Sequence, residues 1–127
     1  MHNQTIPQGK LVIQTVAMPA DTNANGDIFG GWLVSHMDMG AGIAARRRSR
    51  SRVVTVAINS LTFIKPVSVG DTVCCYAELL NIGRTSMQFK MEAWTISLNE
   101  DIPKKAAEGI FIFVAINNEG KSQPVDR

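Results

Sequence analysis

Three residues within one short stretch have the types and the spacing to act on a carbonyl group. Gly30 and Gly31 stand where an apolar helical segment begins, and Asp38 follows Gly31 by seven residues, or about two helical turns. Amides in the first turn of a helix lack intrahelical partners, so they can donate to a developing oxyanion, and glycine lets a substrate reach the backbone. A carboxylate on the same face can activate water or attack directly. The combination favours hydrolysis of an activated acyl group.

Asp38 is the one formally charged residue between Ile28 and Ala45. The alternative interpretation is structural, because single carboxylates in apolar segments often accept backbone hydrogen bonds. Asn23, in the polar run before the helix, adds a neutral group able to orient water or a carbonyl. His36 lies about 200° from Asp38 around a helix, so we interpret it as structural or interfacial.

The sequence contains no motif typical of nucleotide binding, of a serine nucleophile or of a zinc site. It has no Walker loop, no GxGxxG, no serine elbow and no Cys/His spacing typical of zinc. We therefore expect neither a metal nor a cofactor. Cys74 and Cys75 are adjacent, so in a strand they would point to opposite faces and we expect no disulfide between them.

Length and composition indicate one globular domain spanning residues 1–127, with flexible ends at 1–9 and 121–127. The chain is 45% hydrophobic and 19% charged, and its formal net charge of +2 argues against bulk nucleic-acid binding. The start of the sequence lacks the basic and apolar regions of a signal peptide. We expect a cytoplasmic protein without membrane insertion.

The elements that must position these residues are one helix and several strands. We expect a helix over about 29–47, with Asp27 able to cap it, and this helix is apolar nearly all round, which is typical of a buried helix. Short turns link the strands and favour antiparallel pairing. The sequence thus predicts an α+β fold in which an antiparallel sheet of five to six strands wraps around one long central helix. The expected strands cover residues 11–16, 53–58 continuing to 64, 72–80, 85–96 and 106–116.

Two patterns concern the surface of this fold. In the fourth strand Met87 to Ala93 alternates cleanly, but Trp94 and Ile96 place apolar groups on the polar face, which suggests cover by another element or subunit. The last strand is continuously apolar, so we expect both its faces to be covered. A partly apolar outer face predicts oligomerisation.

Five arginines lie at the end of this helix and just after it: Arg46, Arg47, Arg48, Arg50 and Arg52. Cations at a helix C-terminus interact favourably with its dipole, which makes a solvated helix end the simpler reading. A nucleic-acid patch is the alternative, but the run lacks interleaved aromatic residues.

Several segments together make the sequence resemble the YciA-type acyl-CoA thioesterases of the hotdog-fold superfamily. The likeness extends from about residue 11 to residue 120, which is more specific than any short motif. It is carried by Met18-Pro19, Asp21–Trp32, Met37–Gly40, Arg52–Ala57, Phe63–Pro66, Val69–Asp71 and Gly83-Arg84.

The resemblance implies a hotdog fold and hydrolysis of acyl-CoA to a free acid and CoA. It implies that the helical aspartate is Asp38, that the glycines at the helix start are Gly30 and Gly31, and that Asn23, or Asn25 two residues on, acts on Asp38 across a dimer interface. Hotdog dimers join two sheets edge to edge, and these thioesterases often form trimers of dimers. Because CoA carries phosphates, Lys65, Arg84, Thr85 and Ser86 beside two turns are candidate CoA-binding residues.

Two departures and two alternatives remain. His36 and the run from Arg46 to Arg52 differ from the family pattern, and we connect them with assembly or CoA binding. One alternative is a hotdog hydratase or dehydratase, which would want a histidine near the helix start, where this chain has Phe29. The other is a non-catalytic binder of CoA or nucleic acid.

Overall fold

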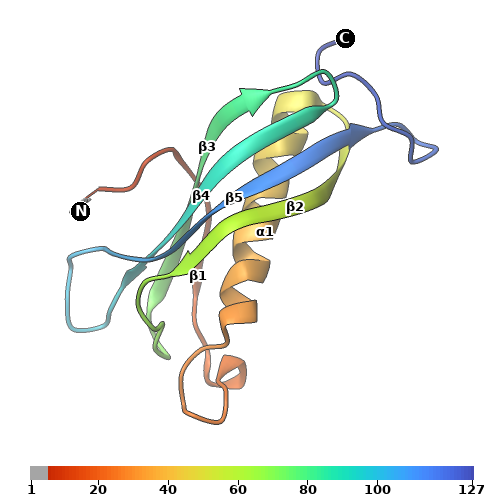
Figure 1. Ribbon diagram of the computed structural model, residues 1–127. Coiled ribbons are helices and arrows are strands. Elements are labelled where there is room, and N and C mark those ends of the chain that lie inside the picture. The colour runs from red at the N-terminus through yellow and green to blue at the C-terminus, as the bar shows by residue number, and fades with distance from the viewer. Residues whose placement is uncertain (1–5) are drawn as a thin grey trace.

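A computed structural model describes residues 6–127 of the chain. One five-stranded antiparallel sheet, in the order β1-β3-β4-β5-β2, curves around a single long helix (Figure 1). This confirms the α+β hotdog architecture. The elements are β1 (Lys10–Val16), the short 3₁₀ helix η1 (Pro19–Asp21), α1 (Gly30–Ser49), β2 (Arg52–Phe63), β3 (Thr72–Ile82), β4 (Ser86–Ile96) and β5 (Lys104–Ile116).

The two ends that we expect to be flexible, residues 1–9 and 121–127, are only partly among the described residues. Residues 1–5 lie outside the described residues. At the other end, Val125 is buried and its amide donates to the Arg84 carbonyl at 2.9 Å. Flexibility of 6–9 and 121–127 stays a prediction.

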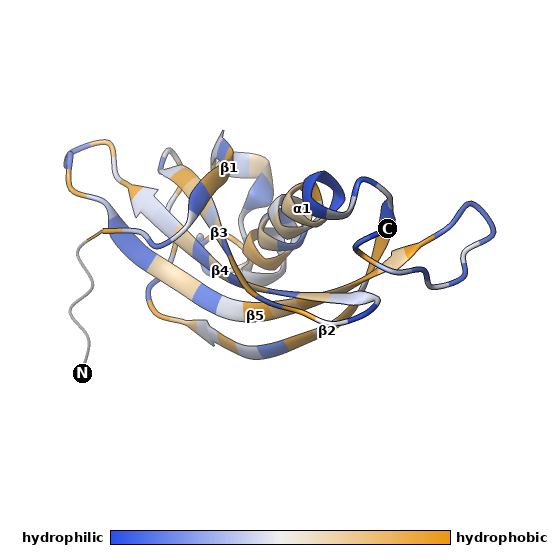
Figure 2. Cartoon of the chain, turned by 90° about the horizontal axis from the view of Figure 1, so that it is seen from above, coloured by the Kyte–Doolittle hydropathy of each residue, from blue (hydrophilic) through white to orange (hydrophobic). Residues whose placement is uncertain are grey.

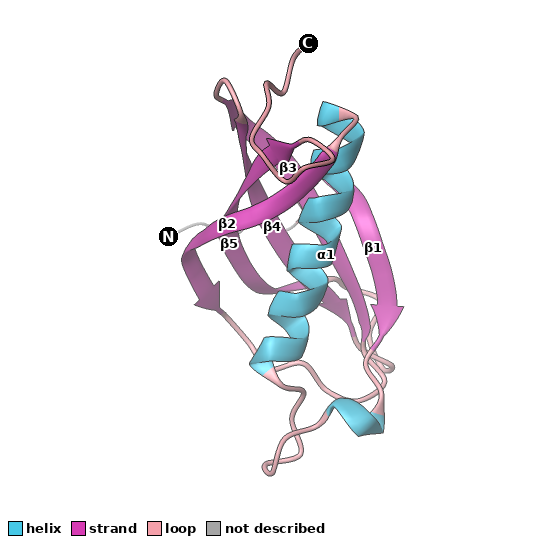
Figure 3. Ribbon diagram, turned by 90° about the vertical axis from the view of Figure 1, so that its right-hand side faces the viewer, coloured by secondary structure: helices cyan, strands magenta, loops and turns pink. Residues whose placement is uncertain are grey.

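The helix is covered by the sheet on one face only, so the expectation of a fully buried helix is wrong for a single chain. Leu33, Met37, Ala41 and Ala45 form a buried stripe against the sheet. The opposite side carries Met39, which is 55% exposed. A sheet can curve around only part of a helix, and here it leaves one side of α1 open to view (Figure 3).

The start of α1 differs from our expectation that Asp27 caps it. Phe29 occupies the N-cap position and no side chain caps the helix. Asp27 lies two residues before this position, in the preceding loop, where its amide donates to Asn23 Oδ1 at 3.2 Å. The helix entry is held by backbone bonds, with the Ile28 amide donating to Val67 at 3.1 Å and the Phe29 amide donating to Asp21 at 3.1 Å.

The inner face of the sheet confirms the predicted alternation, since Met87, Phe89, Met91 and Ala93 are all buried toward α1. Trp94, on the outer face, is 1% exposed and its Nε1 donates to Glu92 Oε1 at 2.9 Å. The Gln8 amide donates to the same oxygen at 3.1 Å. The chain's own N-terminal segment therefore helps to cover this end of β4.

The outer side of β5 is less covered than predicted. Phe111 and Phe113 are buried under α1, whereas the outward Ile110, Ile112 and Val114 are only partly buried. Viewed from above, α1 occupies one side of the curved sheet and leaves the other side without a second layer (Figure 2). The expectation that both faces of this strand are covered is thus wrong within one chain.

The two edge strands are unequal. β1 has 7 residues and a register shift between Leu11 and Ile13, whereas β2 has 12 residues. Val54, Val56 and Ile58 on β2 are 40%, 54% and 38% exposed. A long apolar edge strand is a template for pairing with another chain.

The adjacent cysteines form no disulfide, as expected, and both thiols are free and buried. Burial raises the pKa of Cys75 to about 12, with Cys74 as a smaller cause. Cys75 is therefore a protonated packing residue at neutral pH.

Candidate active site

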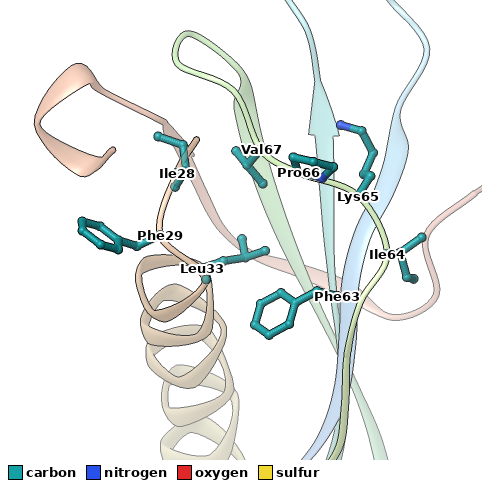
Figure 4. Close-up of a pocket in the computed structure, with 9 residues that line it drawn as sticks. Ile28, Phe29, Leu33, Phe63, Ile64, Lys65, Pro66 and Val67 are labelled. Atoms are coloured by element: carbon teal, nitrogen blue, oxygen red, sulfur yellow. The ribbon is translucent and has the colours of Figure 1, made fainter. Parts of the chain in front are cut away.

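The start of α1 combines free amides with an apolar pocket. Within residues 6–127, the amides of Gly30 and Gly31 donate no hydrogen bond. A pocket of about 310 Å³ is lined in part by Gly30, and its size is within the range of small-molecule sites. Figure 4 shows its walls, formed by the helix start and the segment after β2. The lining residues are Ile28, Phe29, Gly30, Leu33, Phe63, Ile64, Lys65, Pro66 and Val67.

The two glycines have different surroundings. A Cβ on Gly30 would lie 3.2 Å from the Phe63 ring, so glycine lets β2 approach the helix start closely. A Cβ on Gly31 would have no atom within 4 Å. Gly31 therefore leaves open space beside an unpaired amide, which is the arrangement that an incoming oxyanion requires.

Asp38 lies on α1, half-buried, and its carboxylate has one side-chain partner. Thr55 Oγ1, on the edge strand β2, donates to Asp38 Oδ1 at 2.7 Å. This hydrogen bond fixes one carboxylate oxygen and leaves the other for a reacting group. Thr55 was missed by the sequence analysis, because it is 17 residues away along the chain and no spacing rule connects it to Asp38.

Distance separates Asp38 from the glycine amides within one chain. Seven residues of helix at about 1.5 Å each put Gly31 and Asp38 about 10 Å apart along the axis. They share a side of α1, as predicted, but one carbonyl group cannot touch both. Within a single chain, the candidate carboxylate and the candidate oxyanion donors are therefore separated along α1.

Asn23 has a local role in its loop. Its Oδ1 accepts from the Asn25 amide at 2.9 Å and from the Asp27 amide at 3.2 Å. This shapes the turn before α1 and engages the side-chain oxygen. The side-chain NH₂ is the part of Asn23 left to contact a substrate.

The candidate CoA-binding residues lie at two opposite ends of the sheet. Lys65 borders the pocket, but its Nζ donates to Thr95 Oγ1 at 2.9 Å, and Figure 4 shows the amine directed away from Phe29 and Leu33. Arg84 and Thr85 lie in the turn between β3 and β4, followed by Ser86 at the start of β4. That turn lies at the end where Ile82 pairs with Met87, far from the end where Thr72 pairs with Ile96.

His36 contacts its own helix, in agreement with a structural role. Its Nδ1 lies 2.9 Å from the Trp32 carbonyl oxygen, and the two rings are in contact, with centroids 4.2 Å apart and planes tilted by 40°. Among residues 6–127, no group of three or more His, Cys, Asp or Glu side chains is placed to hold a metal ion. None of the described helices has the length and apolar character to span a membrane.

Comparisons with known proteins agree on one family. Residues 25–101 match the thioesterase superfamily. The chain is 52% identical over 122 residues to the acyl-CoA thioester hydrolase YciA of Salmonella typhimurium, covering 94% of this chain and 92% of that protein. Its fold is similar to that of the hexameric thioesterase from Yersinia pestis, with a TM-score of 0.92 and 47% identity over 96% of this chain and 99% of that one.

A second solved structure is similar to a comparable degree. It is the structure of a hexameric broad specificity acyl-coenzyme A thioesterase in which one aspartate is replaced by alanine. The TM-score is 0.91 and the identity 47%, over 94% of this chain and 88% of that one.

Proposed function

This chain belongs to the thioesterase superfamily as a YciA-type acyl-CoA thioester hydrolase, and from that premise we infer that it cleaves acyl-CoA at sites shared by two subunits. The observation that carries the shared site is the separation of about 10 Å between Asp38 and the Gly31 amide along α1. A second copy can supply the missing half. The products are a free acid and CoA, and the chemistry requires no cofactor.

The edge strand β2 provides the means of assembly. Within one chain Thr55 contacts Asp38, and Phe63 lies against Gly30. If two β2 edges pair antiparallel about a two-fold axis near Asn59, Thr55 of one subunit lies opposite Phe63 of the other. Asp38 of the first subunit then approaches the helix start of the second. Three such dimers form the proposed hexamer, the state of the two solved relatives.

The reaction follows from this placement. The acyl chain occupies the apolar pocket, and its carbonyl oxygen accepts from the Gly30 and Gly31 amides of that subunit. Asp38 of the other subunit takes a proton from water as the water adds to the carbonyl carbon. The C–S bond then breaks, and the proton passes to the CoA thiolate. Direct attack by Asp38, giving a mixed anhydride that water hydrolyses, is the second route.

Polar groups around the reacting centre have supporting roles. Thr55 holds one Asp38 oxygen, and the NH₂ of Asn23 is available to orient water or the thioester. Lys65, Arg84, Thr85 and Ser86 contact the CoA portion. Since Arg84 and Lys65 lie at opposite ends of one sheet, they reach one CoA from different subunits.

Two free cysteines fit a reducing compartment, and we place the activity in the cytoplasm.

Turnover of a panel of acyl-CoAs by the purified protein tests the activity. Asp38→Ala is expected to lower kcat by about 10²–10⁴-fold, the usual contribution of a general base. Asp38→Asn should behave in the same way. Wild-type turnover in Asp38→Asn would exclude the role of Asp38, and binding of acyl-CoA by the wild type without turnover would exclude hydrolysis.

Mixed dimers test the sharing of sites. In this experiment, equal amounts of an Asp38→Ala protein and a Gly31→Val protein, each expected to be inactive alone, are unfolded and refolded together. A shared site predicts recovery of about one quarter of wild-type turnover, because each heterodimer regains one intact site. No recovery, despite heterodimers detected by native mass spectrometry, would mean that each site lies within one chain.

A further inference from the structure

The C-terminal end of α1 presents an unneutralised positive surface. Arg46, Arg47, Arg50 and Arg52, here called the arginine cluster, are all exposed. They line a hollow of about 570 Å³ together with Ile43, Ser51 and Asn118. Among residues 6–127, no ion pair joins any member of the cluster to an acidic side chain.

The neighbouring Arg48 shows the contrast. Its Nη1 donates to Asp126 Oδ1 at 2.8 Å, and this hydrogen bond lowers the pKa of that carboxyl. Arg48 does not line the hollow. One helix end therefore holds one neutralised arginine and, beside it, several that face open space.

Backbone geometry gathers the cluster. Arg50 ends the helix with a φ of 53°, in the left-handed region, and its amide donates to the Arg46 carbonyl at 2.7 Å. The chain turns back at this point, so Arg52 begins β2 beside the helix end, and its Nη1 donates to the Asn118 carbonyl at 3.4 Å. Crowding like charges is unfavourable unless an anion occupies the space between them. Guanidinium groups match phosphate oxygens in particular.

An open path leads from the catalytic carboxylate to this cluster. Arg46 follows Asp38 by eight residues, or about 12 Å along the helix, and Arg50 lies about 18 Å away. Between them Met39, Gly42 and Ile43 are exposed or only partly buried, and α1 itself has no charged residue between Asp38 and Arg46. A flexible arm attached to a thioester at Asp38 can extend along this stripe to the arginines.

We propose that the arginine cluster binds phosphate groups of the CoA whose thioester reacts at Asp38 of the same subunit. The inference rests on the proposed function and assigns a specificity role to residues 46–52. CoA has the required form, with a pantetheine arm between its thioester and its phosphates. It carries a diphosphate and a separate 3′-phosphate, so contacts at Arg84 are compatible with the cluster.

Kinetics on two substrates test the proposal. Arg46→Ala/Arg47→Ala is compared with wild type on an acyl-CoA and on the matching acyl-pantetheine, which lacks phosphates. Both sites are exposed helix positions where alanine is favourable, so the variant should fold, which circular dichroism checks. The KM for acyl-CoA should rise about tenfold, equivalent to about 1.4 kcal/mol, with kcat within about twofold. Kinetics on acyl-pantetheine should not change.

Arg48→Ala is the matched control, because it removes the same side chain from the same helical turn but one already paired with Asp126. Its KM for acyl-CoA should stay at the wild-type value. An unchanged KM in the double variant, with wild-type hydrolysis intact, would overturn the arginine cluster assignment and leave the proposed function standing. A KM that rises equally for both substrates would also overturn it. Failure of the wild type to hydrolyse either thioester would instead overturn the proposed function.

Discussion

The two sides of α1 have similar amino acids but different environments. Met37 and Met39 stand two residues apart, yet Met37 is 0% exposed beneath the sheet and Met39 is 55% exposed. Gly40 is packed against β1, whereas Gly31 faces open space. The side against the sheet is closed by the protein's own core, and the open side carries Asp38, the free amides and the path to the arginines.

This difference shows how one helix can separate stability from chemistry. The closed side contributes burial, which is the main favourable term in folding. The open side contributes little to the folding of one chain, so its small and apolar residues remain available to a substrate and a second subunit. Substitutions on the closed side should therefore lower stability, whereas substitutions on the open side should lower activity.

The largest expected contrast is in stability between the two methionines. Met37→Ala removes a fully buried side chain and should lower the free energy of unfolding by about 2–5 kcal/mol. Met39→Ala should change it by less than about 0.5 kcal/mol, as exposed positions do. Urea denaturation of both variants measures the difference. Equal losses would mean that the open side of α1 is buried in the assembly as deeply as the closed side.

The glycines should separate stability from activity. A Cβ on Gly40 would lie 2.7 Å from Val12 Cγ2, so Gly40→Ala should cost about 1–3 kcal/mol by overpacking, offset in part by about 1 kcal/mol of helix propensity. Gly31→Ala meets no atom within 4 Å and should keep or raise the melting temperature.

For activity, we expect the opposite result: Gly31→Ala should lower it more than Gly40→Ala does. The methyl group of Gly31→Ala displaces the carbonyl from the amide donors, and kcat/KM should fall about tenfold or more. The Gly40→Ala protein that remains folded should hydrolyse acyl-CoA nearly as well as wild type. Full activity in Gly31→Ala would show that the helix start does not approach the carbonyl.

The smallest expected effect concerns Thr55, a positioning residue at the boundary of the open side. Thr55→Val removes the 2.7 Å hydrogen bond to Asp38 and should lower kcat by roughly tenfold, equivalent to about 1.4 kcal/mol, with little change in stability. Thr55→Ser keeps the hydroxyl and should restore kcat. A pH–rate profile that is the same in Thr55→Val and wild type would indicate that Thr55 acts on packing and not on Asp38.

Much of the fold was accessible from the sequence because local patterns determine local elements. Alternation from Met87 to Ala93 predicted the buried face of β4, and the lone Asp38 in an apolar helix identified the candidate carboxylate. Each depends on residues near one another along the chain. The near-uniform apolar character of the helix, in contrast, could not indicate which side the sheet covers.

Other features required the folded chain. The prediction of an Asp27 cap was wrong because the helix begins later, with Phe29 at the N-cap position. Thr55 became visible as a partner of Asp38 only when β2 folded against the helix. Lys65 and Arg84 were grouped as CoA contacts, and strand pairing placed them at opposite ends of the sheet.

The sequence by itself determined the order of elements, the single helical carboxylate and the glycines at the helix start. It did so because helical periodicity and side-chain chemistry depend on neighbours within a few residues. Only the tertiary structure decided that Thr55 contacts Asp38, that β2 lies at an edge of the sheet, and that four arginines share one hollow. These facts depend on backbone pairings between distant segments, which no short-range pattern specifies.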